Sequence, residues 1–277
     1  TLEIDTRLLD SYGPPPAPLR QFYLDARKAF ADNRKADFTD DAIVQAAGKH
    51  QLQLMGGPML GQLRADGVTF WLRPANTAPV AIAVGNSTQT VRPQQAGEAV
   101  QINVKGLKPD SHYSYRVIVD NKIVADGGFR TAPGEDSKGT FRLTFGSCCH
   151  KIGIHNVNLY QQILQRSPHA MMLLGDIAVD DRNDEINMHR ADYQLRDVST
   201  GFRSLATQVP LYASWDDHDY FDNDLSGIPR RYTAGDRDNV RRVYRENWVN
   251  PPRPAGQEGI YFNARIGPVE IIMLDTR

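Results

Sequence analysis

From residue 139 onward, short apolar runs alternate with longer helical segments, and this alternation restricts the fold more than any other feature of the sequence. The apolar runs cover 141–145, 170–174 and 211–214, with helical character at 157–165 and 187–206 between them. Strand, helix, strand, helix, strand is typical of an α/β layer with parallel strands. Right-handed crossovers then bring the ends of all three strands to one edge of the sheet. A further helix and a hairpin are predicted at 236–247 and at 261–264 with 269–274.

In the preceding segment, residues 55–133, the apolar residues follow a different spacing. Turn residues such as Ala65-Asp66-Gly67 separate short alternating runs, which is the pattern of an antiparallel β-sandwich. Trp71, in the second run, is predicted to be a core aromatic. The polar turn Pro133–Lys138 then marks a domain boundary. The predicted strands cover 59–64, 68–73, 80–84, 100–104, 113–119 and 122–125.

The first 54 residues are predicted to be an N-terminal arm and a short helix. Pro14 to Pro16, with Pro18, favour extended polyproline-like packing or a mobile arm. Thr39 and Asp40 then indicate a helix start, and the apolar stripe that follows ends at Gly48. The expected domains are therefore the arm and helix at 1–54, the sandwich at 55–133 and the α/β domain at 139–277.

Composition excludes several classes of protein. The chain has 277 residues, 40% hydrophobic, and a formal net charge of -1, so no basic stripe for nucleic acid is evident. No apolar run approaches the roughly 20 residues of a membrane-spanning helix. The two cysteines, Cys148 and Cys149, are adjacent, which is too close for an unstrained disulfide. A metal ligand, a reactive thiol and a pair of small buried hydrophobes all remain open for them.

Polar side chains follow each of the three predicted parallel strands. Gly146-Ser147-Cys148-Cys149-His150 follows the first, Gly175-Asp176 with further aspartates the second, and Trp215–Asp224 the third. Ligands bind at this edge of open α/β sheets. Crowded carboxylates need a cation; oxygen ligands suit calcium, magnesium or manganese, whereas a thiolate suits iron or zinc. The sequence therefore predicts a mixed two-metal site suited to hydrolysis of a phosphate ester.

Each of these motifs also has a structural interpretation. A single Gly-Asp after a strand is more often a helix cap than a ligand, and only the succession of three such loops reverses this preference. His218, flanked by aspartates, is the histidine that we single out, while the arginines after it favour a solvated helix face, with a phosphate-orienting arginine as the alternative. Surface or structural roles are expected for His150, His155, His169 and His189. The arginines are Arg230, Arg231, Arg241, Arg242 and Arg245.

Two stretches resemble known families. Residues 104–133, VKGLKPDSHYSYRVIVD and then GGFRTAP, resemble fibronectin type III domains. FGSCCH at 145–150, MMLLGD at 171–176, LYASWDDHDYFDND at 211–224 and IIMLDTR at 271–277 resemble the PhoD-type alkaline phosphatase and phosphodiesterase family, of the calcineurin-like metallophosphoesterase superfamily. The resemblance implies an α+β multidomain fold, a fibronectin III-like β-sandwich followed by the N-terminal part of an α/β metallophosphoesterase sandwich.

The resemblance also implies an activity and its residues. Cys148 matches an iron ligand, Asp176 the carboxylate that bridges two metals, and Asp217 and Asn223 further metal-binding positions. His218 matches the catalytic histidine beside the substrate phosphate. The implied cofactors are iron and calcium, with zinc, manganese or magnesium as alternatives. The implied reaction is hydrolysis of phosphate monoesters or phosphodiesters by a secreted or periplasmic enzyme.

The sequence departs from the family pattern at two points. The family has a tyrosine ligand where this chain has Val179, which leaves Asp180 or Asp181 as substitutes. A downstream Gly-Asp-x-His segment has no counterpart before Arg277, so we expect only the first half of the domain. Either a second polypeptide carries the C-terminal half, or the chain is a fragment or processed form. One rival hypothesis is a non-catalytic, calcium-stabilised cell-surface binding module. Another keeps the metal centre but assigns phospholipid or nucleic acid as substrate, and the neutral net charge opposes extended nucleic acid.

Overall fold

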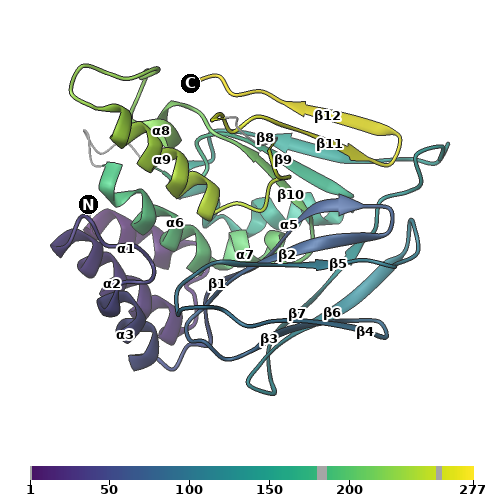
Figure 1. Cartoon of the computed structure of the whole chain (residues 1–277), viewed down its shortest axis with the longest axis horizontal. Helices are drawn as coiled ribbons and strands as arrows, with labels where there is room; N and C mark the ends of the chain where they lie inside the picture. The colour runs from purple at the N-terminus through teal and green to yellow at the C-terminus, as the bar shows by residue number, and fades with distance from the viewer. Residues whose placement is uncertain (1, 180–185, 254–257) are drawn as a thin grey trace.

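The computed structural model describes residues 2–179, 186–253 and 258–277, and in these residues the strands form four sheets. Two antiparallel sheets lie at one end of the molecule, and a parallel sheet with its helices and a hairpin lies at the other (Figure 1). This mixed α/β architecture is as predicted. A fibronectin type III identity for the antiparallel part, and the division into domains, stay predictions.

The N-terminal segment is helical on both sides of Pro14–Pro16, so the prediction of an extended or mobile arm was wrong for these flanking residues. The proline run itself is not helical, and Pro16 is extended, with φ of -48° and ψ of 141°. Pro16 precedes α2 and Pro18 lies in its first turn, where a proline removes no helical hydrogen bond. Phe22, Ala26 and Phe30 then recur at helical spacing and are buried. The short helix expected near Asp40 is confirmed. The three helices are α1 (Leu2–Ser11), α2 (Ala17–Asp32) and α3 (Asp41–Lys49).

The antiparallel part has two sheets, with strand orders β1-β2-β5 and β4-β3-β6-β7. All six predicted strands are present, and β4 was missed because its exposed sequence, STQTV, shows no apolar alternation. Trp71 is buried, as expected. The strands are β1 (Leu54–Arg64), β2 (Gly67–Pro74), β3 (Val80–Val84), β4 (Ser87–Val91), β5 (Val100–Val104), β6 (His112–Val119) and β7 (Lys122–Arg130).

The second part contains a sheet in which β9 pairs with β8 and β10, both in parallel. The predicted α/β layer is therefore confirmed, and the carboxyl ends of the three strands share one edge. Two short helices within the loops, α4 and α8, were not predicted. The elements are β8 (Leu143–Gly146), α4 (His150–Ile154), α5 (Val157–Gln165), β9 (Ala170–Leu174), η1 (Ile186–Met188), α6 (His189–Val198), α7 (Thr200–Ala206), β10 (Leu211–Ser214), α8 (Asp217–Tyr220), α9 (Ala234–Glu246), β11 (Phe262–Ile266) and β12 (Val269–Met273).

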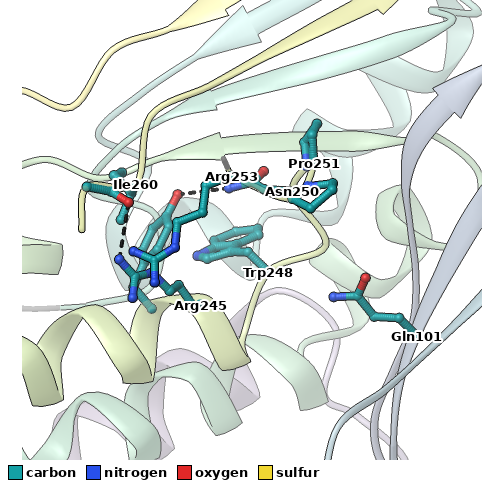
Figure 2. A pocket seen from close by; sticks show the side chains of 10 residues that line it. Gln101, Arg245, Trp248, Asn250, Pro251, Arg253 and Ile260 are labelled. Atoms are coloured by element: carbon teal, nitrogen blue, oxygen red, sulfur yellow. Dashed lines mark hydrogen bonds between the residues drawn. The ribbon is translucent and has the colours of Figure 1, made fainter. Parts of the chain in front are cut away.

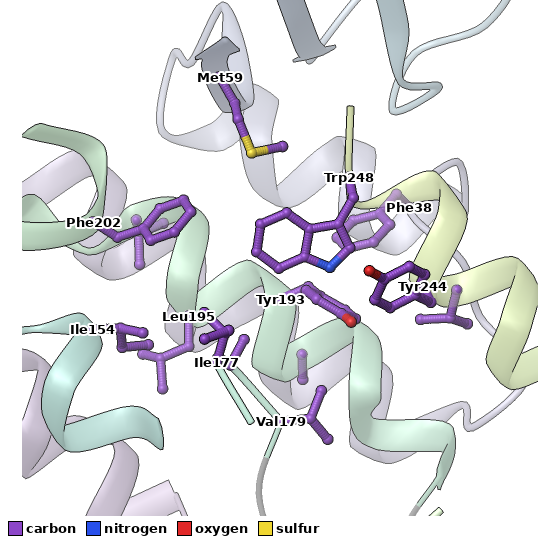
Figure 3. Close-up of a cluster of buried hydrophobic side chains, with 14 of the residues drawn as sticks. Phe38, Met59, Ile154, Ile177, Val179, Tyr193, Leu195, Phe202, Tyr244 and Trp248 are labelled. Carbon is purple, nitrogen blue, oxygen red and sulfur yellow. The ribbon is translucent and has the colours of Figure 1, made fainter. Parts of the chain in front are cut away.

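A cluster of buried aromatic side chains joins the helices of the second part. The Trp248 indole lies edge-on to Tyr193, with ring centroids 6.2 Å apart, and packs against Phe202 and Tyr244 (Figure 3). Edge-to-face packing of this kind adds to the gain from burial. None of the described helices is long and apolar enough to cross a membrane.

The side chain of Asn250 occupies the outer edge of β10. Its amide oxygen accepts from the backbone N–H of Ala213 at 2.8 Å, and its amide nitrogen donates to the carbonyl oxygen of the same residue at 2.9 Å. One side chain thus satisfies both backbone groups that a neighbouring strand would otherwise pair. Tyr212, on the same strand, reaches the antiparallel part, where its hydroxyl accepts from the Leu63 backbone N–H at 2.8 Å.

Candidate metal centre

The loops after β8 and β9 are joined by backbone hydrogen bonds. The N–H of Cys148 donates to the carbonyl oxygen of Gly175, and the N–H of His150 donates to that of Asp176, both at 3.0 Å. Cys148, His150 and Asp176 all have left-handed backbones, with φ of 54°, 45° and 55°. Such conformations are unfavourable for residues other than glycine and persist where the surrounding structure holds them, often at functional sites.

Gly175 allows the loop after β9 to approach the loop after β10. Its φ is +97°, and a Cβ atom built there would lie 2.5 Å from both Cβ and N of Asp216. No side chain fits that space. Only glycine therefore permits Asp176 and Asp216 to lie this close together.

Asp176 lies at the centre of the candidate site. It is 5% exposed, its Oδ2 lies 3.5 Å from Cys148 Sγ, and its Oδ1 has no hydrogen-bond partner among the described residues. A buried carboxylate oxygen is costly unless it is paired or binds a metal. Asp176 is therefore the residue that most clearly requires a cation.

Other metal-ligating side chains surround Asp176. Ligand atoms of His150, Asp176 and His218 all lie within 4.8 Å of one another, as do those of Asp176, Asp216 and Asp217. The imidazole rings of His150 and His218 are nearly perpendicular, with centroids 5.0 Å apart. Carboxylates and imidazoles together suit borderline metals such as zinc and iron, and the carboxylates alone suit harder ions.

The remaining residues of the third loop differ in their surroundings. Asp217 is buried and accepts from the backbone N–H groups of His218 and Asp224, at 3.1 and 2.6 Å. Asn223 is exposed, and its amide nitrogen donates to Asp224 Oδ2 at 2.9 Å. The structure thus brings Cys148, Asp176, Asp217 and His218 to one sheet edge and places the Asn223 amide on the outer side of the turn. The metal and catalytic roles of these residues stay predictions.

Asp219 links two of the loops from inside. Its Oδ2 accepts from the N–H groups of Asp176 and Asp216, at 2.5 and 3.1 Å. Burial raises the pKa of Asp219 to about 8, and the hydrogen bond from Asp176 opposes this rise. Asp219 therefore holds together the loops that follow β9 and β10.

The end of the chain contacts the same loop. Arg277 forms an ion pair with Asp216, and Asp275 Oδ1 accepts from the indole N–H of Trp215 at 2.7 Å. Asp275 Oδ2 also accepts from the backbone N–H of Ile260 at 2.9 Å. The segment after β12 therefore fixes the orientation of Trp215, next to the acidic residues.

The adjacent cysteines have different surroundings. Cys148 is exposed, whereas Cys149 packs against the helical core and its Sγ lies 3.5 Å from the carbonyl oxygen of Ile177. Burial raises the pKa of the Cys149 thiol to about 12. Both are free thiols. Of the roles left open by the sequence, that of a metal ligand or reactive thiol therefore fits Cys148, and that of a buried hydrophobe fits Cys149.

His150 is the residue that the sequence reasoning placed elsewhere. It was assigned a surface or structural role, yet its ring faces His218 at the centre. The one available signal was its position two residues after Cys148 in the same loop. His155, His169 and His189 are buried away from this group, in keeping with structural roles.

Two further sequence expectations concern the loop after β9 and helix α9. Val179 is 0% exposed and belongs to the helical core, so it offers no ligand (Figure 3). Asp180, Asp181 and Asp184 lie outside the described residues. The expected solvated face holds for Arg230, Arg231 and Arg242, which are exposed. Arg241 and Arg245 are partly buried: Arg241 pairs with Glu258, and Arg245 donates to the carbonyl oxygens of Glu258 and Gly259.

A separate cavity of about 290 Å³ lies beside α9. It is walled by Trp248, Asn250 and Pro251, with Arg245 and Arg253 at its mouth (Figure 2). None of the residues of the candidate metal centre lines it. The cavity is therefore distinct from the metal-ligating group.

Comparisons with known proteins find one family match and structures with a similar fold. A family model described as a domain of unknown function (DUF7800) matches residues 51–133. No curated protein matches the chain. A structure of PhoD is 20% identical with a TM-score of 0.61, over 80% of this chain and 52% of its own. Purple acid phosphatase PPD1 from yellow lupin (Lupinus luteus) seeds is 15% identical with a TM-score of 0.56, over 78% of this chain and 43% of its own.

These likenesses concern the fold. At 52% and 43% coverage, the chain spans about half the length of either phosphatase structure. Both coverages of this chain, 80% and 78%, exceed what the antiparallel sheets alone could supply, so the match includes the parallel sheet. The chain therefore shares the fold of the corresponding parts of PhoD and the lupin purple acid phosphatase.

Proposed function

We propose that this chain belongs to a metal-dependent phosphoesterase that hydrolyses phosphate monoesters or phosphodiesters. The observation that carries the proposal is the buried, half-unpaired carboxylate of Asp176, with the ligand atoms of two histidines and two further aspartates close to it. Isolated caps and turns do not gather such a set. The resemblance of the strand-end motifs and the shared fold support the same conclusion.

The residues present fit two metal ions. Cys148, Asp176 and His150 would hold one, and Asp176 with Asp217 the other. Asn223 is a further ligand implied by the resemblance, although its amide lies on the outer side of the turn. A thiolate ligand suits iron or zinc and the oxygen-rich position suits calcium, manganese or magnesium. The metals would supply charge neutralisation at the phosphoryl oxygens and an acidified water.

The chain's own residues would carry out the remaining steps. His218, whose ring lies near Asp176, would donate a hydrogen bond to the phosphoryl group or a proton to the leaving oxygen. Asp217 holds the His218 backbone through the N–H bond at 3.1 Å. Asp219 holds the loops that carry Asp176 and Asp216 together. Arg277, paired with Asp216, adds positive charge at the rim.

The test combines metal content with turnover. The purified chain should contain bound metal and hydrolyse nitrophenyl phosphate or bis-nitrophenyl phosphate, and Asp176→Asn should abolish both. Asp136→Asn, on the exposed turn between the two parts, is the matched control and should behave as wild type. A folded, metal-free protein whose Asp176→Asn and Cys148→Ser variants are indistinguishable from it would overturn the proposal.

Exposed apolar side chains support the proposal of a completing polypeptide. Leu174 lies at the exit of β9, and Phe145 on β8 is 71% exposed; Ile272 and Leu274 are also exposed. A partner that carries the C-terminal half of the domain would cover them. Intact-mass analysis of material purified from its natural source would show whether such a fragment accompanies this chain. Export to the periplasm or the extracellular space is part of the same proposal, tested by fractionation.

The second candidate is the calcium-stabilised binding module, and Val179 favours it. The family ligand at that position is replaced by a side chain buried in the hydrophobic core. A calcium-dependent rise in melting temperature, without phosphate affinity or turnover, would select this candidate.

A further inference from the structure

Four charged side chains outside the metal centre form a buried cluster, which we call the Asp5 cluster. It consists of Asp5 on α1, Arg27 on α2, Lys151 on α4 and Asp192 on α6. Asp5 and Asp192 are completely buried, and Lys151 is 3% exposed. The cluster joins the N-terminal helices to the first helix after β8, and α1 contacts α4 in the fold.

The contacts within the Asp5 cluster are short. Asp5 Oδ1 lies 2.8 Å from Lys151 Nζ, and Asp5 Oδ2 lies 2.8 Å from Arg27 Nε. Lys151 Nζ also lies 2.9 Å from Asp192 Oδ1. The Lys151 ammonium is thus held between carboxylates from two different helices.

Stability alone does not account for such a cluster. The desolvation of buried ions offsets much of their attraction, and apolar residues of similar volume often stabilise a fold as well or better. Removing one member is nevertheless destabilising, because a buried charge then loses its partner. Buried ionic groups of this kind can fix the position of an element, and here the element carries the metal centre.

Lys151 directly follows His150, at the start of α4. The backbone of His150 is left-handed, with φ of 45°. It is maintained by the hydrogen bond from its N–H to Asp176 and by the ion pairs that hold Lys151, the next residue. The other end of α4 is also fixed, since Ser199 Oγ donates to the carbonyl oxygen of Ile154 at 2.6 Å. The helix that begins with His150 is therefore clamped at both ends.

We propose that Asp5 is a positioning residue for the metal centre: through Lys151 it holds His150 beside Asp176 and His218. The N-terminal helices are on this account part of the site's support. The consequence for catalysis rests on the proposed function, whereas the placement of His150 is testable without it.

The test separates support of the site from support of the fold. Asp5→Asn leaves two buried cations, Lys151 and Arg27, and only one carboxylate of the cluster, Asp192. The urea midpoint should therefore fall. Asp5→Asn with Arg27→Met leaves Lys151 paired with Asp192, whose atoms lie 2.9 Å apart, so most of that loss should be recovered. The double variant still lacks the contact between Asp5 and Lys151, so its metal centre should remain impaired.

Two readouts report on the site in the full chain. Hydrogen–deuterium exchange of the segment 147–153 should be at least tenfold faster in the double variant, because Asp5 no longer holds Lys151 and the start of α4. Zn²⁺ affinity measured by calorimetry should fall about 10- to 100-fold, as for the loss of other groups that orient a ligand. Asp10→Asn is the matched control, since the Asp10–Arg20 pair joins the same two helices at the surface, 2.6 Å apart, and should leave both readouts unchanged.

A double variant with recovered stability and wild-type exchange would overturn the proposal, whatever its Zn²⁺ affinity. If the wild-type chain binds no Zn²⁺ and has no turnover, the proposed function fails. The exchange rates of the segment 147–153 still decide the placement of His150 in that case.

Discussion

Replacing Gly175 with alanine tests whether the metal centre depends on the close approach of two loops. An alanine with φ near +97° costs about 1 to 2 kcal/mol from backbone strain alone. Its Cβ would also lie 2.5 Å from Cβ of Asp216, where nonbonded carbons normally stay about 3.5 to 4.0 Å apart. The loops must therefore separate by roughly 1 Å, and such overpacking costs about 1 to 3 kcal/mol more.

The expected result is a loss of roughly 2 to 5 kcal/mol in the free energy of unfolding. A 1 Å displacement of a site can lower turnover about 100-fold, so activity should fall by that order even in folded protein. Urea unfolding, Zn²⁺ calorimetry and turnover of bis-nitrophenyl phosphate measure the three quantities.

Gly146→Ala is the matched control for this experiment. Gly146 ends the neighbouring strand β8, and a Cβ there meets nothing closer than Met171 Cε, at 3.9 Å. Its stability should stay within roughly 0.5 kcal/mol of wild type. Wild-type stability and Zn²⁺ affinity in Gly175→Ala would refute the argument that the two loops need glycine to meet.

Three further predictions concern individual side chains of the second part. Burial lowers the pKa of His155 to about 4, from 6.5. The unfolded chain therefore binds more protons between these values, and stability falls as the pH drops through them. Between about pH 7 and pH 4.5, wild type should lose about 2 kcal/mol more than His155→Gln in urea unfolding; equal losses would contradict this. A thiol reagent should modify exposed Cys148 and spare Cys149, and Zn²⁺ should protect Cys148; labelling of Cys149 first, followed by peptide mass, would contradict the assignment. Asp275→Asn should lower stability by about 1 to 3 kcal/mol, because the Trp215 indole loses a charged partner; an unchanged Trp fluorescence and urea midpoint would count against it.

The parallel sheet was readable from the sequence because its signals are local. The runs at 170–174 and 211–214 coincide with β9 and β10, and the helix at 157–165 coincides with α5. β4 was not readable, since it is an exposed strand of polar residues that forms by pairing with β3. The N-terminal helices were missed because a proline run was read as extended, although proline also suits a first helical turn.

The metal centre was readable in its residue types and less so in its geometry. The carboxyl ends of the parallel strands predicted which loops would lie close together, and Cys148, Asp176 and His218 do lie together. The place of His150 depends on a left-handed backbone and on a hydrogen bond to a loop 26 residues later, neither of which leaves a pattern in the sequence. The Asp5 cluster joins residues far apart in the chain, so only the folded structure reveals it.

The Asn250 side chain at the edge of β10 determines at which edge the parallel sheet can accept a further strand. Because this amide already occupies both backbone groups of Ala213, a new strand cannot pair there without displacing it. On the opposite edge, no described strand other than β9 pairs with β8, whose Phe145 is exposed. Any segment that extends this sheet, from a partner chain or from a second copy, must therefore add beside β8, within reach of the loop that carries Cys148.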